Sequence, residues 1–274
     1  MLIKQIHKIE NKSITAVDAL KYRMSINVKL DGLSLLILQG EETIVALNYQ
    51  WQESNWEDCS TNFEQILKDN SFVVFNYKSV DIFIESVHST IIPKEFFKDF
   101  NKQDLLSQYL GNNEFMAFSQ ELKAEDAVLI FGVHKILNTI ISKYFVNARV
   151  LHSSAMFIDS VLLAKKNNSY ISLKVRTNNF EVIAYNDSKL LAHNNFAYKT
   201  IDEFMFLLLS FVKQQHFDID KTRLVLCEDL LLDSKIATQL KMFFSNIEEF
   251  NNNANNENEK VFYSLKTNTI IANN

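Results

Sequence analysis

The sequence is poor in proline, glycine and cysteine. Its 274 residues include 1 proline, 4 glycines and 2 cysteines. Asn, Asp and Ser must therefore form most turns, and we expect long elements joined by short loops. The two cysteines, Cys59 and Cys227, lie far apart, which argues against a disulfide framework or a cysteine-rich zinc site. We expect a reduced, cytoplasmic protein.

Excess positive charge and a long hydrophobic run are also absent. The net charge is −5, and the longest basic cluster is Lys165-Lys166. The strongly apolar segment Phe204–Val212 is shorter than the roughly 20 residues that span a bilayer, and Met1–Gln5 lacks the apolar core of a signal peptide. We therefore expect no nucleic-acid partner and no integral membrane segment. A composition of 47% hydrophobic and 22% charged residues is typical of globular proteins.

A pattern of three strands joined by short turns occurs twice, at Ser25–Tyr49 and at Ser172–Phe196. The two segments align without a gap. Turns are expected at Gly40-Glu41 in the first copy and at Asp187-Ser188 in the second. The predicted strands are 26–29, 33–38 and 43–49, then 173–176, 180–185 and 190–196.

The rest of the chain alternates between helical and strand patterns. Residues 1–21 are expected to be a polar, helical lead-in, 165–168 a hinge and 251–260 a polar loop. The predicted helices are 57–68, 95–97, 102–110, 134–144, 156–163, 201–214 and 234–244. The predicted strands are 72–77, 81–86, 114–122, 126–133, 148–152, 222–226, 261–265 and 269–272.

Each half of the chain then has the order strand, strand, strand, helix, strand, helix. We predict an α/β protein of two tandem duplicated βββαβα halves with mixed sheets. The first half is residues 1–166, with an insertion at about 78–122, and the second is residues 167–274. This topology is typical of the actin-like ATPase, or ribonuclease H-like, superfamily.

Several segments resemble a family of uncharacterised bacterial proteins that is defined only as a domain of unknown function. They are Leu30–Ser34, Ala148–Ser154, Asn179–Ile183 and Lys189–Asn194, and the resemblance covers most of residues 22–250. It implies an actin-like ATPase fold, distantly similar to the actin-like protein of type IV pilus assembly. The family brings no known activity with it.

Active members of this superfamily hold Mg-ATP between their two halves, and their phosphate loops use an Asp-x-Gly motif. By the resemblance, this motif falls on Asn27-Val28-Lys29 in the first half and on Lys174-Val175-Arg176 in the second. The adenosine-binding Gly-Gly falls on Cys227-Glu228-Asp229. Because the acid and the glycines are missing, we expect a pseudo-ATPase with no cofactor.

Six side chains remain candidates for a cleft between the two halves. Asp31-Gly32 could be a shifted phosphate motif, but Asp-Gly between apolar strands favours an ordinary hairpin turn. Lys29 and Arg176 occupy matched positions and could bind an anion from both sides, although a solvated strand face is the commoner arrangement. The candidates are Asn27, Lys29, Asp31, His152, Lys174 and Arg176.

His152-Ser153-Ser154 contains a base and two nucleophile types in sequence. Neighbours along a strand point to opposite faces, and no third orienting group is evident. A sheet-end histidine followed by a serine helix cap explains the triplet without catalysis. The histidines are dispersed and neither cysteine has a nearby metal partner, so we expect no metal site and no catalytic residue.

The sequence therefore favours a non-catalytic binding or scaffolding module with an unknown protein partner. The alternative is an enzyme that binds a nucleotide or another anion in the cleft. A third reading, a membrane-associated assembly platform, depends on analogy with the pilus protein alone.

Overall fold

The structure is a computed structural model that forms two compact units. The first unit comprises Met1–Leu122, Asp126–Met156 and Leu265–Asn274, and the second comprises Lys123–Glu125 and Phe157–Ser264. The residues that the structure describes are 2–52, 55–97, 101–111, 113–164, 169–176, 178–186, 189–227, 235–249, 265–266 and 268.

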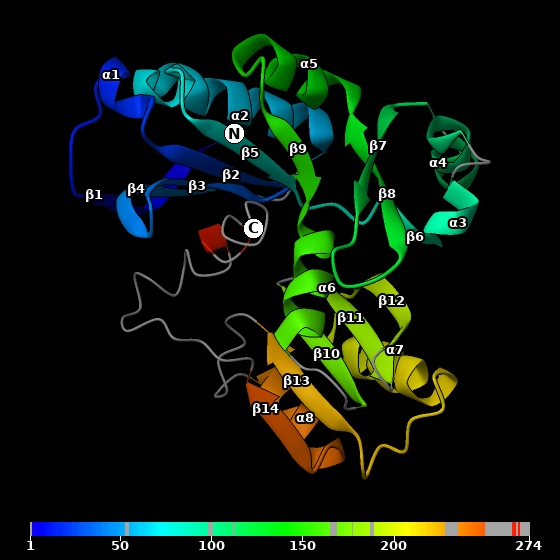
Figure 1. Cartoon of the computed structure of the whole chain (residues 1–274). Helices are drawn as coiled ribbons and strands as arrows, with labels where there is room; N and C mark the ends of the chain where they lie inside the picture. Colours follow the sequence, from blue (N-terminus) through cyan, green and yellow to red (C-terminus); the bar gives the residue numbers. More distant parts are fainter. Residues whose placement is uncertain are drawn as a thin grey trace. The chain divides into compact units, whose positions relative to one another are not determined.

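A six-stranded mixed sheet, in the order β1-β4-β3-β2-β5-β9, forms the centre of the first unit (Figure 1). The strands from β1 to β2 pair antiparallel, whereas β2, β5 and β9 run parallel. The strands are β1 (Lys4–Glu10), β2 (Arg23–Lys29), β3 (Gly32–Gln39), β4 (Glu42–Gln50), β5 (Ser79–Ile84) and β9 (Arg149–His152).

Helices α2 (Trp56–Asp69) and α5 (Lys135–Tyr144) lie together over one face of this sheet (Figure 1). The Asn55 side chain caps α2 by accepting the Asp58 N–H at 2.8 Å. The helix buries the apolar face at Phe63, Ile66 and Leu67 that the sequence predicts. The shorter elements around it are α1 (Ala16–Ala19) and the 3-10 turn η1 (Ser71–Val74).

Three strands between β5 and α5 form a separate antiparallel sheet in the order β6-β8-β7. The insertion was expected at about 78–122. Its beginning differs because β5 belongs to the large sheet, and its end differs because β8 belongs to the small sheet. Helix α4 ends at Gly111, whose φ of 68° confirms the predicted left-handed cap. The inserted elements are β6 (Ser89–Pro93), α3 (Lys94–Phe97), α4 (Lys102–Leu110), β7 (Phe115–Glu121) and β8 (Ala127–His134).

The second unit contains a five-stranded mixed sheet in the order β12-β11-β10-β13-β14. Helix α6 (Ser153–Ala164) begins in the first unit and continues into the second. The other helices are α7 (Ile201–Gln214) and α8 (Lys235–Phe243). The strands are β10 (Tyr170–Val175), β11 (Asn179–Asn186), β12 (Lys189–Ala197), β13 (Arg223–Cys227) and β14 (Asn246–Glu249).

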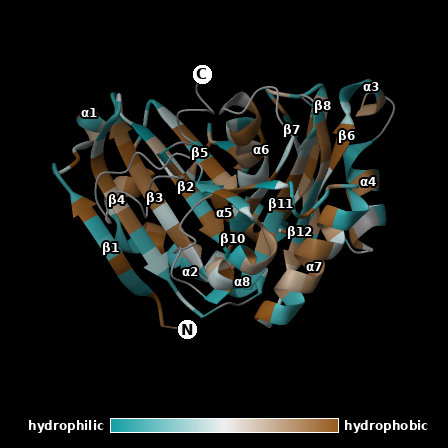
Figure 2. Cartoon of the chain, turned by 90° about the horizontal axis from the view of Figure 1, so that it is seen from below, coloured by the Kyte–Doolittle hydropathy of each residue, from teal (hydrophilic) through white to brown (hydrophobic). Residues whose placement is uncertain are grey.

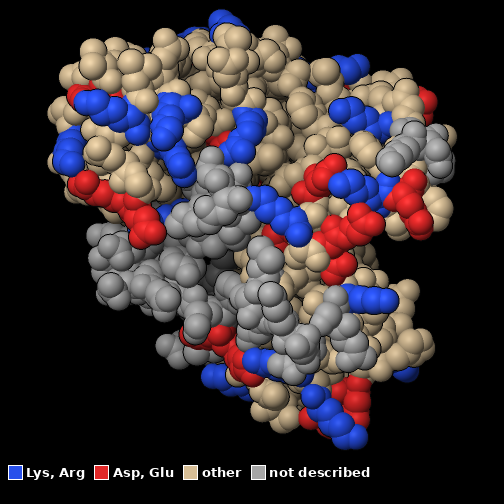
Figure 3. Space-filling model, viewed as in Figure 1, with Lys and Arg blue, Asp and Glu red and all other residues tan. Residues whose placement is uncertain are grey.

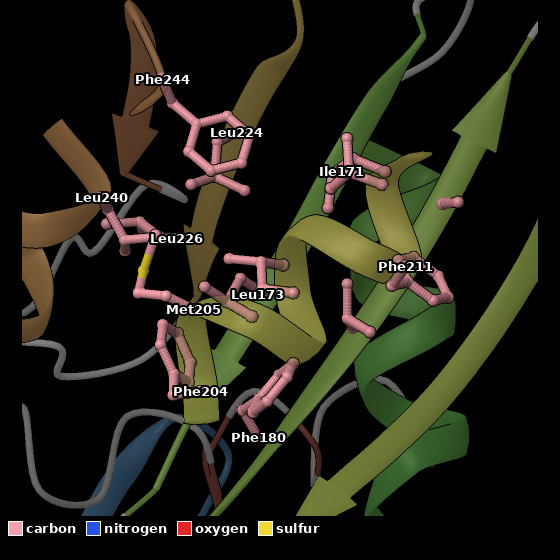
Figure 4. Packing of buried hydrophobic residues seen from close by; sticks show 14 of the residues in the cluster. Ile171, Leu173, Phe180, Phe204, Met205, Phe211, Leu224, Leu226, Leu240 and Phe244 are labelled. Carbon is pink, nitrogen blue, oxygen red and sulfur yellow. The ribbon is translucent and has the colours of Figure 1, made fainter. Parts of the chain in front are cut away.

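The core of the second unit lies between this sheet and the helices α7 and α8 (Figure 4). Leu173, Phe180 and Leu226 from the strands meet Phe204 and Phe211 from α7, and all five are buried. Thr200 caps α7 as predicted, because its hydroxyl accepts the Glu203 N–H at 3.1 Å. The Glu203 carboxylate accepts the Lys199 N–H at 2.8 Å, one residue before the Thr200 N–H that a capping box would use. Hydrophobic residues follow α7 along most of its length (Figure 2).

The two predicted three-stranded segments have the same pairing register. Ser25 pairs with Leu36 in the first segment, and Ser172 pairs with Ile183, the aligned positions, in the second. The register shift between Ile37 and Leu38 recurs between Ala184 and Tyr185. The gapless alignment therefore holds at the level of strand pairing.

Some sequence expectations are wrong in detail. Residues 1–21 contain strand β1 as well as the short helix α1, whose cap is Thr15. The strand expected at 72–77 is absent, since the 3-10 turn η1 begins at Ser71 and the strand that follows is β5. Expectations for residues 165–168, 187–188, 228–229, 233–234, 251–264 and 269–272 lie outside the described residues.

Helix length and surface charge are two further features of the described part of the chain. No helix there is long and apolar enough to cross a bilayer. On the face that Figure 3 draws, the described acidic and basic side chains are interspersed.

Candidate functional site

The turn between β2 and β3 is held from inside the first unit by three hydrogen bonds to consecutive carbonyl oxygens. The Cys59 thiol donates to Lys29 O at 3.2 Å, and the Trp51 indole N–H donates to Leu30 O at 2.8 Å. The Trp51 backbone N–H donates to Asp31 O at 3.0 Å. Asp31 therefore lies on a hairpin turn that is held in place, as the sequence favours, and Lys29 is the last residue of the strand before it.

Gly32 was expected to form the hairpin turn together with Asp31, but it lies just after the turn and is required there because a neighbouring backbone comes close. The turn residues are Leu30 and Asp31, and Gly32 is the first residue of β3. Gly32 is not among the glycines with positive φ, which are Gly40 and Gly111. A Cβ atom at Gly32 would lie 2.6 Å from the Tyr49 carbonyl oxygen, so close approach of two backbones excludes a side chain.

The Cys59 thiol beneath this turn is not poised to act as a nucleophile. The side chain is fully buried, and burial together with the nearby Asp31 charge raises the pKa of the thiol to about 12. A thiol with so high a pKa stays protonated at neutral pH. Cys59 therefore acts as a hydrogen-bond donor to the turn.

Asn27 lies in a row of polar side chains that crosses three strands. It pairs with Ser34, which in turn pairs with Asn48, and the Ser34 hydroxyl donates to Asn48 Oδ1 at 3.1 Å. The Asn27 amide donates to Glu85 Oε2 at 3.3 Å, while its Oδ1 has no hydrogen-bond partner among the described residues. The first expected phosphate-motif position is thus an amide in a row of uncharged side chains, and it donates to one carboxylate, Glu85.

His152 is buried with hydrogen bonds at both ring nitrogens. Nε2 lies 3.1 Å from Ser86 O, and Nδ1 accepts the Ser154 N–H at 3.2 Å. This arrangement requires a proton on Nε2 and none on Nδ1, so the ring is the neutral tautomer. The Ser153 hydroxyl donates to Ile84 O at 3.4 Å. The triplet joins β9 to α6, as expected, but the expected serine cap is wrong, because α6 begins at Ser153 and the His152 ring accepts the Ser154 N–H.

The two candidates in the second unit lie in a buried charged cluster. Glu181 on β11 is fully buried, and its Oε1 lies 2.7 Å from His193 Nε2 on β12. Glu181 Oε2 lies 3.5 Å from an Arg176 guanidinium nitrogen. Lys174 pairs with Glu181 across β10 and β11 and has its ammonium 5.9 Å from the centre of the Phe157 ring. We call Lys174, Arg176, Glu181 and His193 the buried charge cluster.

The electrostatics of the buried charge cluster keep Glu181 ionised. Burial by itself would raise the pKa of this carboxyl group, but the His193 hydrogen bond and the positive charges nearby lower it below the ordinary range. Lys174 is 3% exposed and the Arg176 side chain 13%. The expectation of a solvated strand face is therefore wrong for Arg176, because its guanidinium group is largely buried and contacts the Glu181 carboxylate.

A second buried carboxylate, Asp159 on α6, holds the backbone of residues 123 and 124. Its Oδ1 accepts the N–H groups of Lys123 at 2.8 Å and Ala124 at 3.0 Å. Burial raises the pKa of this carboxyl group. Sequence reasoning missed Asp159, Glu181 and His193, because each acts on a group that only the folded chain brings near.

The described residues contain no set of three or more His, Cys, Asp and Glu side chains placed to hold a metal ion.

The six candidates fall into separate groups. Lys29, at the end of β2, and Asp31, in the β2–β3 turn, lie close in sequence, and Lys174 and Arg176 share the buried charge cluster. Within their own units these groups stabilise strands and turns, and the described contacts of the second pair are internal.

Solved structures with the same architecture are known. A protein from Bacteroides thetaiotaomicron, with an actin-like ATPase fold and unknown function, has a TM-score of 0.80 and 23% identity, covering 93% of this chain and 99% of that one. A chain of the PilM-PilN type IV pilus biogenesis complex has a TM-score of 0.57 and 9% identity, covering 90% and 98%. No curated protein matches the chain.

These similarities confirm the predicted fold class, a mixed α/β protein of actin-like ATPase fold. They also agree with the predicted resemblance to an uncharacterised family and to the pilus protein. Residues 11–247 match the family described as protein of unknown function, DUF3822, and the chain belongs to that family.

Proposed function

We propose that this chain is a pseudo-ATPase, a non-catalytic member of the actin-like fold that binds or scaffolds a protein partner. The proposal starts from the positions where the superfamily's Asp-x-Gly motifs are expected. Asn27-Val28-Lys29 and Lys174-Val175-Arg176 offer neither the acid that organises a metal-bound water nor the glycine that lets backbone N–H groups approach a phosphate.

The buried charge cluster is the observation that carries this proposal. At the second position, the Arg176 guanidinium group lies 3.5 Å from the buried, ionised Glu181, and the positive charge of Lys174 also favours the ionised form of Glu181. Binding a phosphate there would take Arg176 away from a buried carboxylate, and removing one partner of a buried ion pair costs about 3 to 5 kcal/mol. The cluster thus supports a role in structure over one in catalysis.

The first position supports the same proposal. The carbonyl groups of Lys29, Leu30 and Asp31 are tied to Trp51 and Cys59, so the turn is rigid. The aligned side chains of Asn27, Ser34 and Asn48 are uncharged, and the Asn27 amide donates to the Glu85 carboxylate at 3.3 Å. The motif position that would carry the Mg²⁺-organising acid therefore holds an amide, Asn27, in place of a carboxylate.

A protein partner is proposed by analogy, because a chain of similar fold occurs in the PilM-PilN complex. The analogy concerns the fold alone, and the partner of this chain need not resemble PilN. We also propose a cytoplasmic location, since both cysteines are buried free thiols, the form expected in a reducing compartment.

A thermal-melt titration with Mg-ATP, with Mg-ADP and without ligand tests the absence of nucleotide binding. A ligand that binds only the folded state at a hundredfold excess over its dissociation constant stabilises it by about 2.7 kcal/mol. For a chain near this size that is a shift of several degrees, roughly 5 °C. We expect no shift at millimolar nucleotide.

A nucleotide-dependent shift would contradict the proposal and support the alternative, an enzyme that uses Lys29 to bind the nucleotide. The variant Lys29→Ala separates the two cases. It should melt like the parent protein with and without nucleotide under our proposal, whereas under the alternative it should lose the shift.

A further inference from the structure

Helices α7 and α8 expose three large hydrophobic side chains to solvent. Phe206 on α7 is 69% exposed, and Met242 and Phe243 on α8 are 72% and 42% exposed. The other large apolar residues of α7 pack against the sheet (Figure 4). Grouped apolar side chains of this size on a surface are typical of an interaction site.

A groove of about 420 Å³ lies between the N-terminal turns of the two helices. The exposed apolar side chains come one helical turn further along, four positions after the lining residues Asp202, Thr238 and Gln239, and so share their helix faces. The groove and the apolar side chains therefore form one surface, which we call the α7–α8 surface. Its members are Ile201, Asp202, Phe206, Lys235, Thr238, Gln239, Met242 and Phe243.

The charges on the α7–α8 surface are balanced. Asp202 on α7 and Lys235 on α8 are both exposed, and neither forms an ion pair with another described residue. A two-fold interface brings the same patch of both copies together, so it requires a patch that complements itself. One acid and one base beside a shared apolar area meet this requirement, since the acid of one copy can face the base of the other.

We propose that the α7–α8 surface is the interface between two copies of this chain related by a two-fold axis. Asp202 of one copy faces Lys235 of the other, and the Phe206 and Met242 side chains are buried between them. The proposal is independent of nucleotide binding, so it stands or falls apart from the proposed function.

Sedimentation equilibrium of the full chain over a micromolar concentration range tests this interface. We expect a dimer whose dissociation constant rises at least about tenfold in Phe206→Glu and in Asp202→Lys, because each places an unpaired charge at the contact. The double variant Asp202→Lys/Lys235→Asp exchanges the two charges and should restore the dimer.

The matched control is Phe96→Glu, because Phe96 on α3 is also an exposed phenylalanine, at 51%. It should leave the dissociation constant unchanged. A chain that is monomeric throughout, or a dimer that Phe206→Glu does not weaken, overturns the proposal. Failure of the charge exchange to restore the dimer overturns the two-fold arrangement. Thermal melts of each variant confirm that it is folded.

Discussion

At the scale of single residues, Gly32 illustrates a constraint imposed by a neighbouring strand. Replacing it with alanine would place a Cβ atom 2.6 Å from the Tyr49 carbonyl oxygen, and a backbone atom cannot move aside as a side chain can. We expect Gly32→Ala to lower the free energy of unfolding by about 1 to 3 kcal/mol, measured by urea denaturation.

Gly40 provides the control for that experiment. Its φ is 60° and nothing lies within 4 Å of the position that a Cβ atom would take. Because asparagine tolerates the left-handed conformation, Gly40→Asn should change the free energy of unfolding by less than about 0.5 kcal/mol. Equal effects of the two substitutions would show that the contact with Tyr49 does not matter.

Glu181 is the residue on which the buried charge cluster depends. In Glu181→Gln, Lys174 and Arg176 lose a buried carboxylate, and we expect a loss of about 3 to 5 kcal/mol in the free energy of unfolding at pH 7. The pKa of Glu181 is lowered on folding from an ordinary value of 4.5. Its contribution is therefore complete above pH 4.5 and is lost as the pH falls below it.

The pH dependence distinguishes this electrostatic role from simple packing. Between pH 7 and the acid range, the difference in unfolding free energy between the parent protein and Glu181→Gln should shrink as the carboxyl group becomes protonated. A difference that stays constant over the whole range would contradict the assignment of an ionised Glu181.

At the scale of elements, the sequence predicted structure well where the signal is local. The Thr200 helix cap and the Gly111 cap each depend on residues close in sequence, and both are found. Strand β1 was missed because its residues gain order from pairing with β4. Glu181 was missed because its partners Lys174 and His193 lie on other strands, and only the pairing of β10, β11 and β12 brings them near it.

Glu64 connects helices α2 and α5. Its carboxylate accepts hydrogen bonds from Lys143 at 2.7 Å, from Lys68 at 3.1 Å and from the Tyr144 hydroxyl at 3.1 Å. Hydrogen bonds first from Lys143 and then from Lys68 lower the pKa of the carboxyl group to about 2. A carbon-detected NMR titration should therefore find Glu64 ionised well below its ordinary value of 4.5.

Substituting the hydrogen-bond donors one at a time shows how much each of them lowers the pKa of Glu64. Lys143→Met should raise the pKa of Glu64 more than Tyr144→Phe does, because a charged donor favours the carboxylate more than a hydroxyl group does. An unchanged pKa in Lys143→Met would show that the Lys143–Glu64 ion pair is absent in solution.

At the scale of the whole molecule, the two compact units should open as separate cooperative units. Each has its own sheet, and regions with their own buried contacts commonly exchange their amides independently. Gly32→Ala should therefore speed native-state hydrogen exchange in β2, β3 and β4 and leave β10, β11 and β12 unchanged. Glu181→Gln should speed exchange in β10, β11 and β12 and leave β2, β3 and β4 unchanged.

The double variant Gly32→Ala/Glu181→Gln makes this prediction quantitative. Substitutions at distant, independent sites add to within about 0.3 to 0.5 kcal/mol, so exchange in each unit should match that of the corresponding single variant. If either single substitution speeds exchange in both units, or the double variant departs from additivity by more than that margin, the units are energetically coupled. In that case the chain unfolds as one domain.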